Sequence, residues 1–325
     1  MGRKIDWERQ IGRRLKLREL HMFLTAVQCG GMAKAAAELG VSQPTVSEAI
    51  ANLEHTFGVR LVDRSHQGIE PTMYGDALLK RSAAAFDELK QSSRDIEFLT
   101  DPTAGELKIG CSETLAATVL PPVIQRFNEK FPRAVLQTDD VVSSEIQIQY
   151  AGLRARKYDL ILTRLLVPRA GDPFVEQDFH VEALFNDQLV VAVGRHSRWA
   201  HRRRIDLAEL IDEPWILTAP GTWNYARVAE AFEAQKLDMP RVCLRTFSVH
   251  LRTHLLASGH FITVLPNSVM RVNSERYALK ALPIDLPVRQ WPVAIVTLKN
   301  RTLSPVVERL IECAREVTKS LARHE

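Results

Sequence analysis

The sequence predicts a multidomain protein in which a small all-α head is followed by one long helix and a larger α/β region. Three short helical patterns occupy residues 17–57, and glycines end each of them. A single apolar stripe then runs through residues 72–99. From Glu106 onward, apolar strands alternate with amphipathic helices, which is typical of α/β sheets. The length of 325 residues fits about two domains or slightly more.

The composition excludes several classes of protein. With 46% hydrophobic and 25% charged residues, the chain lies in the ordinary globular range. No apolar run approaches the ~18 residues that a membrane span needs, and residues 1–18 lack the apolar segment of a signal peptide. The four cysteines are scattered and form no C-x-x-C pair. We therefore expect a protein of the reducing cytoplasm, with neither a disulfide framework nor a zinc ribbon.

Positive charge is concentrated at the N-terminus. Residues 1–18 carry seven basic and two acidic side chains, whereas residues 72–101 carry four basic and six acidic ones. This asymmetry indicates that the head, with a basic extension over residues 1–16, meets a polyanion. A simply solvated, frayed N-terminus is the alternative.

The head contains a helix-turn-helix pattern. Helices are expected from Leu17 to the glycines at 30–31, over 32–39, and from the Ser42 cap to about Phe57, with Pro44 in the first turn. The outer face of the third helix carries polar and small residues suited to base edges: Gln43, Thr45, Ser47, Glu48, Ala51 and Asn52. An ordinary three-helix unit with a polar face is the alternative.

Two short extended segments, 60–64 and 68–72, surround a polar turn and predict a β-hairpin, or wing. Arg64 near its tip is placed to enter a minor groove or to meet a phosphate. The alternative is a salt bridge from Arg64 to Asp63 or Glu38. After the hairpin, the apolar stripe of the helix over 72–99 needs a partner, and a second copy of the same helix is the simplest one. Residues 100–105 predict a hinge.

The sequence of the head resembles the N-terminal domain of LysR-type transcriptional regulators. The matching segments are LRELHMF at 17–23, AKAAAEL at 33–39, VSQPTVS at 41–47, IANLE at 50–54 and FGVRLVDR at 57–64. The resemblance continues through the rest of the chain and leaves out only residues 1–16. It implies a winged helix-turn-helix domain over 17–71, a dimerising linker helix over 72–101 and an effector-binding domain over 102–325. In this family dimers commonly pair into tetramers.

The resemblance also assigns roles to residues of the head. Gln43, Pro44, Thr45 and Ser47 match the positions that enter the major groove, and Arg64 matches the wing arginine. Position 48 is often basic in the family but is Glu48 here. We expect its carboxylate, which contributes to the DNA-facing surface, to accept a hydrogen bond from a cytosine amino group or to pair with a neighbouring arginine.

The C-terminal region predicts two parallel α/β lobes. Strands are expected at 107–111, 134–138, 159–163, 189–193, 215–217, 242–246, 262–266 and 293–298, and helices at 114–130, 145–156, 223–235 and 305–322. The order resembles two Rossmann-like lobes joined by two crossovers, as in periplasmic binding proteins. Lobe I is expected to comprise 105–167 and 271–325, and lobe II to comprise 168–270.

An effector site is expected where strands end and helices begin in this region. By position in the family, the candidate contacts are Ser112, Thr114, Ser144 and Thr222, and Arg164 is placed to bind a carboxylate. Hydroxyls beside helix N-termini with this cation favour a small anionic effector. The alternative for each serine or threonine is plain helix capping.

Other candidate sites are weaker. His250 and His254 have the i, i+4 spacing of metal ligands but no third ligand, so no metal and no cofactor are expected. The basic loop over 195–204 favours a solvated surface over a DNA contact. Cys111 lies at the expected site, where a buried thiol is favoured over a redox sensor.

The function indicated is that of a sequence-specific DNA-binding transcriptional regulator, an activator or a repressor, gated by a small molecule. Its expected partners are operator DNA, the effector, a second copy of the chain and RNA polymerase. An enzyme is disfavoured because G-x-S-x-G, P-loop, G-x-G-x-x-G and H-E-x-x-H motifs are missing. A solute-binding protein without a DNA function is the other alternative, and the helical head disfavours it.

Overall fold

The computed structural model describes residues 14–65, 68–141, 146–165, 178–284, 286 and 291–322. The chain divides into two compact units, residues 1–92 and 93–325, which we describe separately. No helix within the described residues is both long enough and apolar enough to cross a membrane.

Unit 1 is the helical head expected from the sequence. It contains α2 (Leu17–Gln28), α3 (Met32–Leu39), α4 (Gln43–Phe57), β1 (Val62–Ser65), β2 (Gly68–Pro71) and the first part of α5 (Met73–Thr100). Gly40 and Gly58 follow α3 and α4 with φ of 64° and 69°, a left-handed conformation that favours glycine. Phe23, Ile50 and Leu53 are fully buried between the helices. The three-helix pattern is confirmed.

The wing packs against the turn between α2 and α3. β1 and β2 pair in antiparallel register from Val62 opposite Pro71 to Ser65 opposite Gly68. Gly68 has φ of 132°, and a Cβ at this position would overlap the carbonyl oxygen of Gly30. The next residue, Ile69, donates its backbone N–H to that same oxygen at 3.3 Å. A glycine is therefore required where the wing begins its second strand.

Helix α5 has the predicted extent, but its apolar stripe divides in two. Leu78, Leu79 and Phe86 pack against the core of the head in the same chain. Ile96 and Leu99 are 65% and 81% exposed. Part of the stripe therefore completes the head, and only the remainder is available to a partner.

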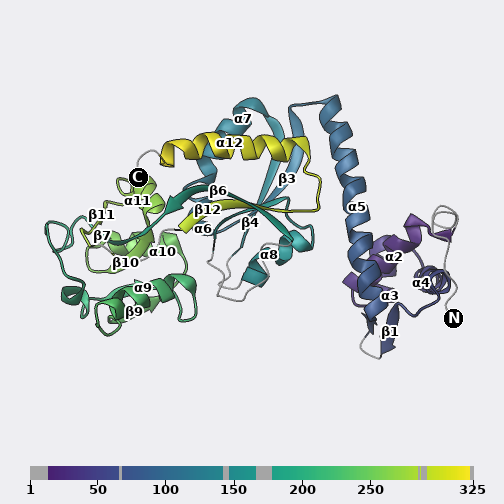
Figure 1. The fold of residues 1–325 in the computed structure, drawn as a ribbon, viewed down its shortest axis with the longest axis horizontal. Coiled ribbons are helices and arrows are strands. Elements are labelled where there is room, and N and C mark those ends of the chain that lie inside the picture. The colour runs from purple at the N-terminus through teal and green to yellow at the C-terminus, as the bar shows by residue number, and fades with distance from the viewer. Residues whose placement is uncertain are drawn as a thin grey trace. The chain divides into compact units, whose positions relative to one another are not determined.

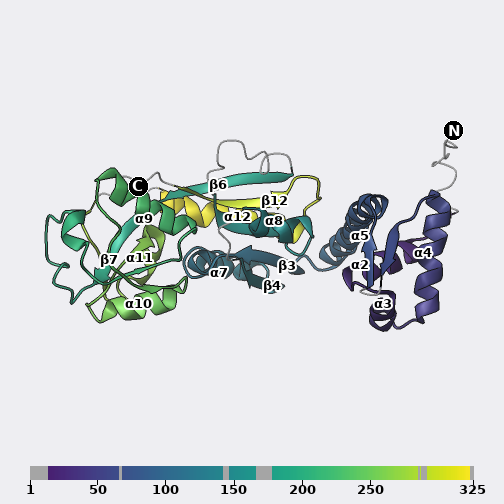
Figure 2. The ribbon, with the colours of Figure 1, turned by 90° about the horizontal axis from the view of Figure 1, so that it is seen from below.

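Unit 2 contains two mixed five-stranded sheets (Figures 1 and 2). The first has the order β4-β3-β5-β12-β6 and defines lobe I, and the second has the order β11-β7-β10-β8-β9 and defines lobe II. The strands of lobe I are β3 (Ala104–Cys111), β4 (Arg133–Asp140), β5 (Leu160–Arg164), β6 (Phe179–Asp187) and β12 (Trp291–Leu298). Those of lobe II are β7 (Leu189–Gly194), β8 (Trp215–Leu217), β9 (Val242–Arg245), β10 (Ile262–Pro266) and β11 (Leu279–Ala281).

Helices cover both faces of each sheet. In lobe I they are α6 (Glu113–Ala116), α7 (Leu120–Lys130), α8 (Ile146–Arg154) and α12 (Pro305–Ala322). α7 and α12 share a core with alternate residues of β5 and β12, whereas α8 packs on the residues between them. In lobe II, a 3₁₀ turn (Leu207–Leu210), α9 (Trp223–Ala234), α10 (Val249–Ala257) and α11 (Asn267–Asn273) surround the sheet.

Three details correct the expectation from sequence. The sheets are mixed. In lobe I, β12 runs antiparallel to both of its neighbours, β5 and β6, and in lobe II, β7 runs antiparallel to both of its neighbours, β10 and β11. The lobe boundaries also move: residues 179–187 belong to the lobe I sheet through eight residue pairs with β12, and residues 279–281 belong to the lobe II sheet through β7. Finally, the helix expected over 114–130 is divided into α6 and α7, since Pro121 and Pro122 supply no N–H and α7 starts anew.

Candidate functional site

The turn between α3 and α4 is built by local capping interactions. Val41 donates its N–H to the Ala36 carbonyl at 3.0 Å and closes the end of α3. The Ser42 hydroxyl accepts from the Thr45 N–H at 3.3 Å, and Pro44 lies in the first turn of α4. The predicted cap and helix start are confirmed.

The first turns of α4 present a polar surface. Gln43, Pro44 and Glu48 are exposed, whereas Thr45 and Ser47 are half-buried. The opposite face of α4 is buried in the core of the head. Within the described residues Glu48 has no ion pair, so its carboxylate is open to an external partner.

Two carboxylates position α4 and the wing, and sequence reasoning missed both of them. Glu54 accepts from the backbone N–H of Leu61 at 2.8 Å and so fixes the start of the wing to the end of α4. Glu19 on α2 accepts from the Asn52 amide at 3.2 Å. Asn52 is exposed, as the sequence predicts, and its amide also joins α4 to α2.

Arg64 lies in β1, on the exposed side of the wing. The alternative of a salt bridge to Asp63 or Glu38 is not seen among the described residues, where Arg64 has no ion pair. Its guanidinium is thus free to meet a phosphate or a groove.

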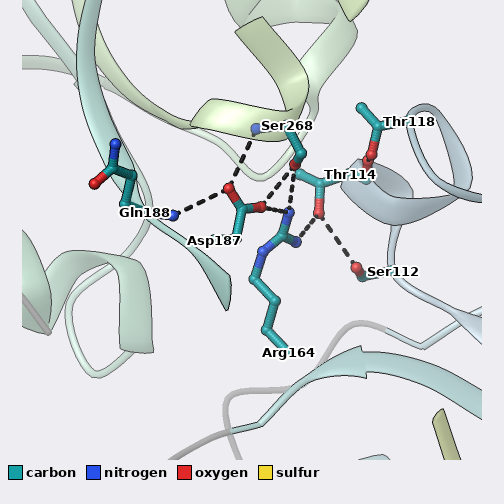
Figure 3. Close-up of polar contacts among 7 residues, drawn as sticks. All are labelled: Ser112, Thr114, Thr118, Arg164, Asp187, Gln188 and Ser268. Carbon is teal, nitrogen blue, oxygen red and sulfur yellow. Dashed lines mark hydrogen bonds and ion pairs between the residues drawn. The ribbon is translucent and has the colours of Figure 1, made fainter. Parts of the chain in front are cut away.

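In unit 2, a cluster of polar side chains joins the two lobes (Figure 3). Arg164, at the end of β5, donates from Nη1 to the Thr114 hydroxyl at 2.6 Å and from Nη2 to Asp187 Oδ2 at 2.9 Å. The same Nη2 lies 3.2 Å from the hydroxyl of Ser268 on α11 in lobe II. Ser112 joins the cluster through its hydroxyl, 3.2 Å from that of Thr114. We call Thr114, Arg164, Asp187 and Ser268 the clasp.

The clasp sits at one of the two places where the chain passes between lobes. Asp187 ends β6 in lobe I, and β7 of lobe II begins two residues later. The carboxylate of Asp187 accepts from the Ser268 hydroxyl at 2.7 Å and from the backbone N–H groups of Gln188 and Ser268 at 3.0 and 3.2 Å. Asp187 is only 4% exposed, so this buried charge is fully hydrogen-bonded, as a stable interior requires.

A second interlobe contact starts from the residue next to Thr114. Glu113, at the start of α6, accepts at both carboxylate oxygens from the N–H of Val249, at 3.1 and 3.0 Å. Val249 is the first residue of α10 in lobe II. A carboxylate at a helix N-terminus meets unpaired N–H groups and the positive end of the helix dipole. Glu113 therefore holds a position that suits any anion.

Two arginines in this region keep an unsatisfied donor. Arg252 on α10 is 2% exposed, and its Nη1 donates to the Val264 carbonyl at 3.1 Å. Burial lowers the pKa of Arg252 to about 10, although the nearby Glu113 carboxylate opposes this effect. Within the described part of the chain, the buried Nε atoms of Arg252 and Arg164 both lack a hydrogen-bond partner.

The structure brings together only part of the predicted effector site. Ser112, Thr114 and Arg164 meet in one cluster, but Arg164 is not a free receptor for a carboxylate, because Asp187 already neutralises it. Thr222 caps α9 by accepting from the Tyr225 N–H, and it bonds to Thr218 and the Ala219 carbonyl. Ser144 lies outside the described residues. Asp187 and Ser268 were missed, and only the need of Arg164 for a counterion pointed to them.

The structure does not favour a reactive thiol at Cys111 or a metal site at His250 and His254. Burial raises the pKa of Cys111 to about 12, which disfavours the reactive thiolate. The rings of His250 and His254 contact each other and Tyr277, with the Tyr277 hydroxyl 3.2 Å from His250 Nδ1. Among the described residues, no group of three or more His, Cys, Asp or Glu side chains is arranged to hold a metal.

Two family profiles match the chain, and together they cover both units. Residues 17–76 match "Bacterial regulatory helix-turn-helix protein, lysR family", and residues 100–319 match "LysR substrate binding domain". Among curated relatives, the regulator TdcA of Escherichia coli K12 is 26% identical over 302 residues, which cover 93% of each chain. GbpR of Azospirillum brasilense is 26% identical over 314 residues, covering 95% of this chain and 89% of GbpR.

Solved structures show the same fold. A full-length OxyR variant from Pseudomonas aeruginosa aligns with a TM-score of 0.64 at 24% identity, covering 93% of this chain and 98% of that one. Full-length CbnR, bound to its target DNA, aligns with a TM-score of 0.59 at 21% identity over 93% and 100% of the two chains. The chain therefore belongs to the LysR family of DNA-binding transcriptional regulators, which are not enzymes, and its α/β unit is the effector-binding domain of that family.

Proposed function

We propose that the chain binds an operator through its head and that a small anionic effector, bound between the two lobes of unit 2, gates this binding or the activation that follows it. The clasp carries this proposal. Thr114 and Arg164 of lobe I meet Ser268 of lobe II through the carboxylate of Asp187 at the crossing point. A ligand that takes over any of these bonds changes what holds the lobes together, which shifts the population of lobe arrangements.

The unsatisfied donors favour a negatively charged ligand. A buried N–H without an acceptor costs about 1–3 kcal/mol, and Arg164 and Arg252 each present such a group. The fixed negative charges, Asp187 and Glu113, balance these two cations in the structure described here. An effector carboxylate gains most where it replaces Glu113 at the start of α10, because the N–H groups there are already arranged for an anion.

In the head, the proposal assigns DNA contacts to the exposed start of α4 and to the wing. The exposed amide of Gln43 suits bidentate reading of adenine, and small hydroxyls suit several bases. Arg64 suits the backbone or the minor groove. The full proposed set is Gln43, Pro44, Thr45, Ser47, Glu48 and Arg64.

The proposal includes a homodimer formed through α5, with dimers pairing into tetramers. Leu89, Ile96 and Leu99 are exposed, and they recur at the i, i+7 and i+10 positions of one helix face. A second copy of the same helix covers such a face by knobs-into-holes packing. Because Leu78 and Phe86 are used inside the head, the dimer contact is assigned to the second half of α5.

The experiment first finds a ligand and then tests the clasp. A thermal-shift screen of the full chain against small mono- and dicarboxylates should identify a compound that raises the unfolding temperature and changes the affinity for operator DNA. Thr114→Val should keep the operator affinity without the compound and should lose the response to it. Thr118→Val is the matched control, since the Thr118 hydroxyl donates to the Thr114 carbonyl and, among the described residues, forms no hydrogen bond with any other member of the clasp.

The same operator-binding assay tests base recognition by the start of α4. Gln43→Ala should weaken operator binding by about 1–3 kcal/mol and relax the preference at one base pair in each half-site, with random DNA bound as before. If the Thr114→Val protein still changes its operator affinity fully when the compound is added, the clasp is not part of the sensing mechanism. Equal losses on operator and random DNA would remove Gln43 from base recognition.

A further inference from the structure

Lobe II contains a cavity of about 590 Å³ that is separate from the clasp. Its walls come from the loop that follows β7, from one face of α11, and from β11 at the edge of the sheet. Asn267, Met270 and Arg271 of α11 line it together with Ser274, which follows the helix, and their spacing places them on one side of the helix. The volume lies within the range of about 300–1,000 Å³ that is usual for small-molecule sites.

Backbone hydrogen bonds hold the three walls in place. Arg195, in the loop, donates its N–H to the Ala278 carbonyl at 2.7 Å. Leu279 donates to the Ser274 carbonyl at 2.8 Å, which ties the start of β11 to the end of α11. Lys280 lies opposite Val193 in the antiparallel pairing of β11 with β7. The cavity is therefore formed before any ligand arrives.

The described lining contains three cationic side chains and no carboxylate. Arg195, Arg271 and Lys280 are the cations, and none of the ten described lining residues is Asp or Glu. Where the chain is described, the side chains of Arg195 and Lys280 have no hydrogen-bond or ion-pair partner. A concave surface lined by one sign of charge concentrates the field and attracts a counter-ion.

The neighbouring arginines of the same loop behave differently. Arg198 forms an ion pair with Glu213, and Arg202 forms one with Glu209 at 2.8 Å. Among the described residues, the loop thus pairs Arg198 and Arg202, whereas Arg195 at the cavity has no ion pair, as is also the case for the exposed Arg203 and Arg204.

Four of the other seven lining residues are apolar, and the remaining three are polar: His201, Asn267 and Ser274. Ala200, Met270 and Leu279 are buried and supply a hydrophobic surface within the cavity. An inorganic ion gains nothing from such a surface, whereas the carbon skeleton of an organic molecule does.

We propose that this cavity is a second ligand site, which binds a small organic dianion. The apolar body lies against Met270 and Leu279, and the two anionic groups meet Arg195 and Lys280. The site does not depend on the proposed effector cleft, because the clasp residues are absent from its lining.

Isothermal titration calorimetry of the full chain with phthalate tests this proposal, because phthalate combines two carboxylates with an apolar ring. Sulfate, with the same charge and no apolar body, is the comparison probe. The test variant is Arg195→Ala with Lys280→Ala. The control is Arg203→Ala with Arg204→Ala, which removes the same charge from exposed arginines of the same loop that do not line the cavity.

We expect phthalate to bind the wild type more tightly than sulfate does. The test variant should bind phthalate about tenfold more weakly or worse, with an unchanged unfolding temperature, while the control binds it normally. Thr114→Val should also bind phthalate normally, which separates this site from the effector cleft. Failure of phthalate to bind the wild type, sulfate binding of equal strength, an equal loss in the control, or a loss in Thr114→Val would each overturn the proposal.

Discussion

Replacing Glu113 should weaken the effector-binding domain by an amount that its contacts at α10 determine. The carboxylate accepts the N–H of Val249 at 3.1 and 3.0 Å, and the N–H of His250 lies 3.5 Å from Oε1. Val249 is buried, so removal of the carboxylate strands its N–H away from water. The stranded donor costs about 1–3 kcal/mol, and loss of the charge at the helix N-terminus adds about 0.3–1 kcal/mol.

Two substitutions separate these contributions. Glu113→Gln keeps an acceptor but loses the charge, so we expect a loss of about 1 kcal/mol. Glu113→Ala removes both, and we expect about 2–3 kcal/mol. In a domain of this size, each kcal/mol corresponds to about 2–4 °C in Tm, so the alanine variant should unfold about 4–12 °C below the wild type.

Rescue by a free carboxylate gives the decisive measurement. In Glu113→Ala, formate can take the place of the missing side chain, and at ten times its Kd it should return about 1.4 kcal/mol. Differential scanning calorimetry in sodium formate, against sodium chloride at equal ionic strength, measures this recovery. The control variant is Glu129→Ala, which removes an exposed carboxylate from α7. The reasoning is refuted if Glu113→Ala is as stable as the wild type, or if formate stabilises all three proteins equally.

Three further predictions concern other parts of the chain. Gly68→Ala should destabilise the head by about 1–3 kcal/mol in urea unfolding, because a Cβ there overlaps a backbone carbonyl and φ is positive. Replacing both Ile96 and Leu99 with Glu should give monomers in sedimentation velocity, and a variant that stays dimeric would refute the assigned contact. The hydrogen bond from Arg315 lowers the pKa of Glu182, so this pair stabilises the fold above the ordinary glutamate pKa and loses its effect as the pH falls through the lowered value. Glu182→Gln should therefore cost about 0.2–1 kcal/mol at pH 7 and nothing in strong acid, and a pH-independent loss would contradict this.

The head was predictable because local chemistry determines it. Gly40 and Gly58 end two helices in the left-handed conformation, and Ser42 caps the next helix through a residue three positions away. Each of these signals is contained within a few neighbouring residues. The predicted exposure of Gln43 and Glu48 followed from the same helical period.

The clasp was only partly predictable because its members are distant in sequence. Arg164 lies 23 residues from Asp187 and 104 residues from Ser268. The sequence pattern predicts Arg164 as a cation at the end of a strand. The carboxylate that neutralises it comes from β6, and no local sequence signal predicts that β6 pairs with β12. The ion pair of Arg164 with Asp187 was not predicted for this reason: a buried arginine needs a counterion, and the sequence does not show which carboxylate supplies it.

The Glu113 contact with lobe II and the clasp meet at one short helix, and this has a mechanical consequence. Glu113 reaches α10 and Thr114 reaches Arg164, and these adjacent residues both belong to the first turn of α6. A displacement of that turn moves both side chains together, because neighbouring residues on one helical turn cannot move independently. A ligand that displaces Glu113 from α10 therefore breaks one interlobe contact and at the same time disturbs the lobe I hydroxyl that Arg164 of the clasp holds. Such coupling favours two discrete lobe arrangements over a continuous range, as a switch between DNA-binding states requires.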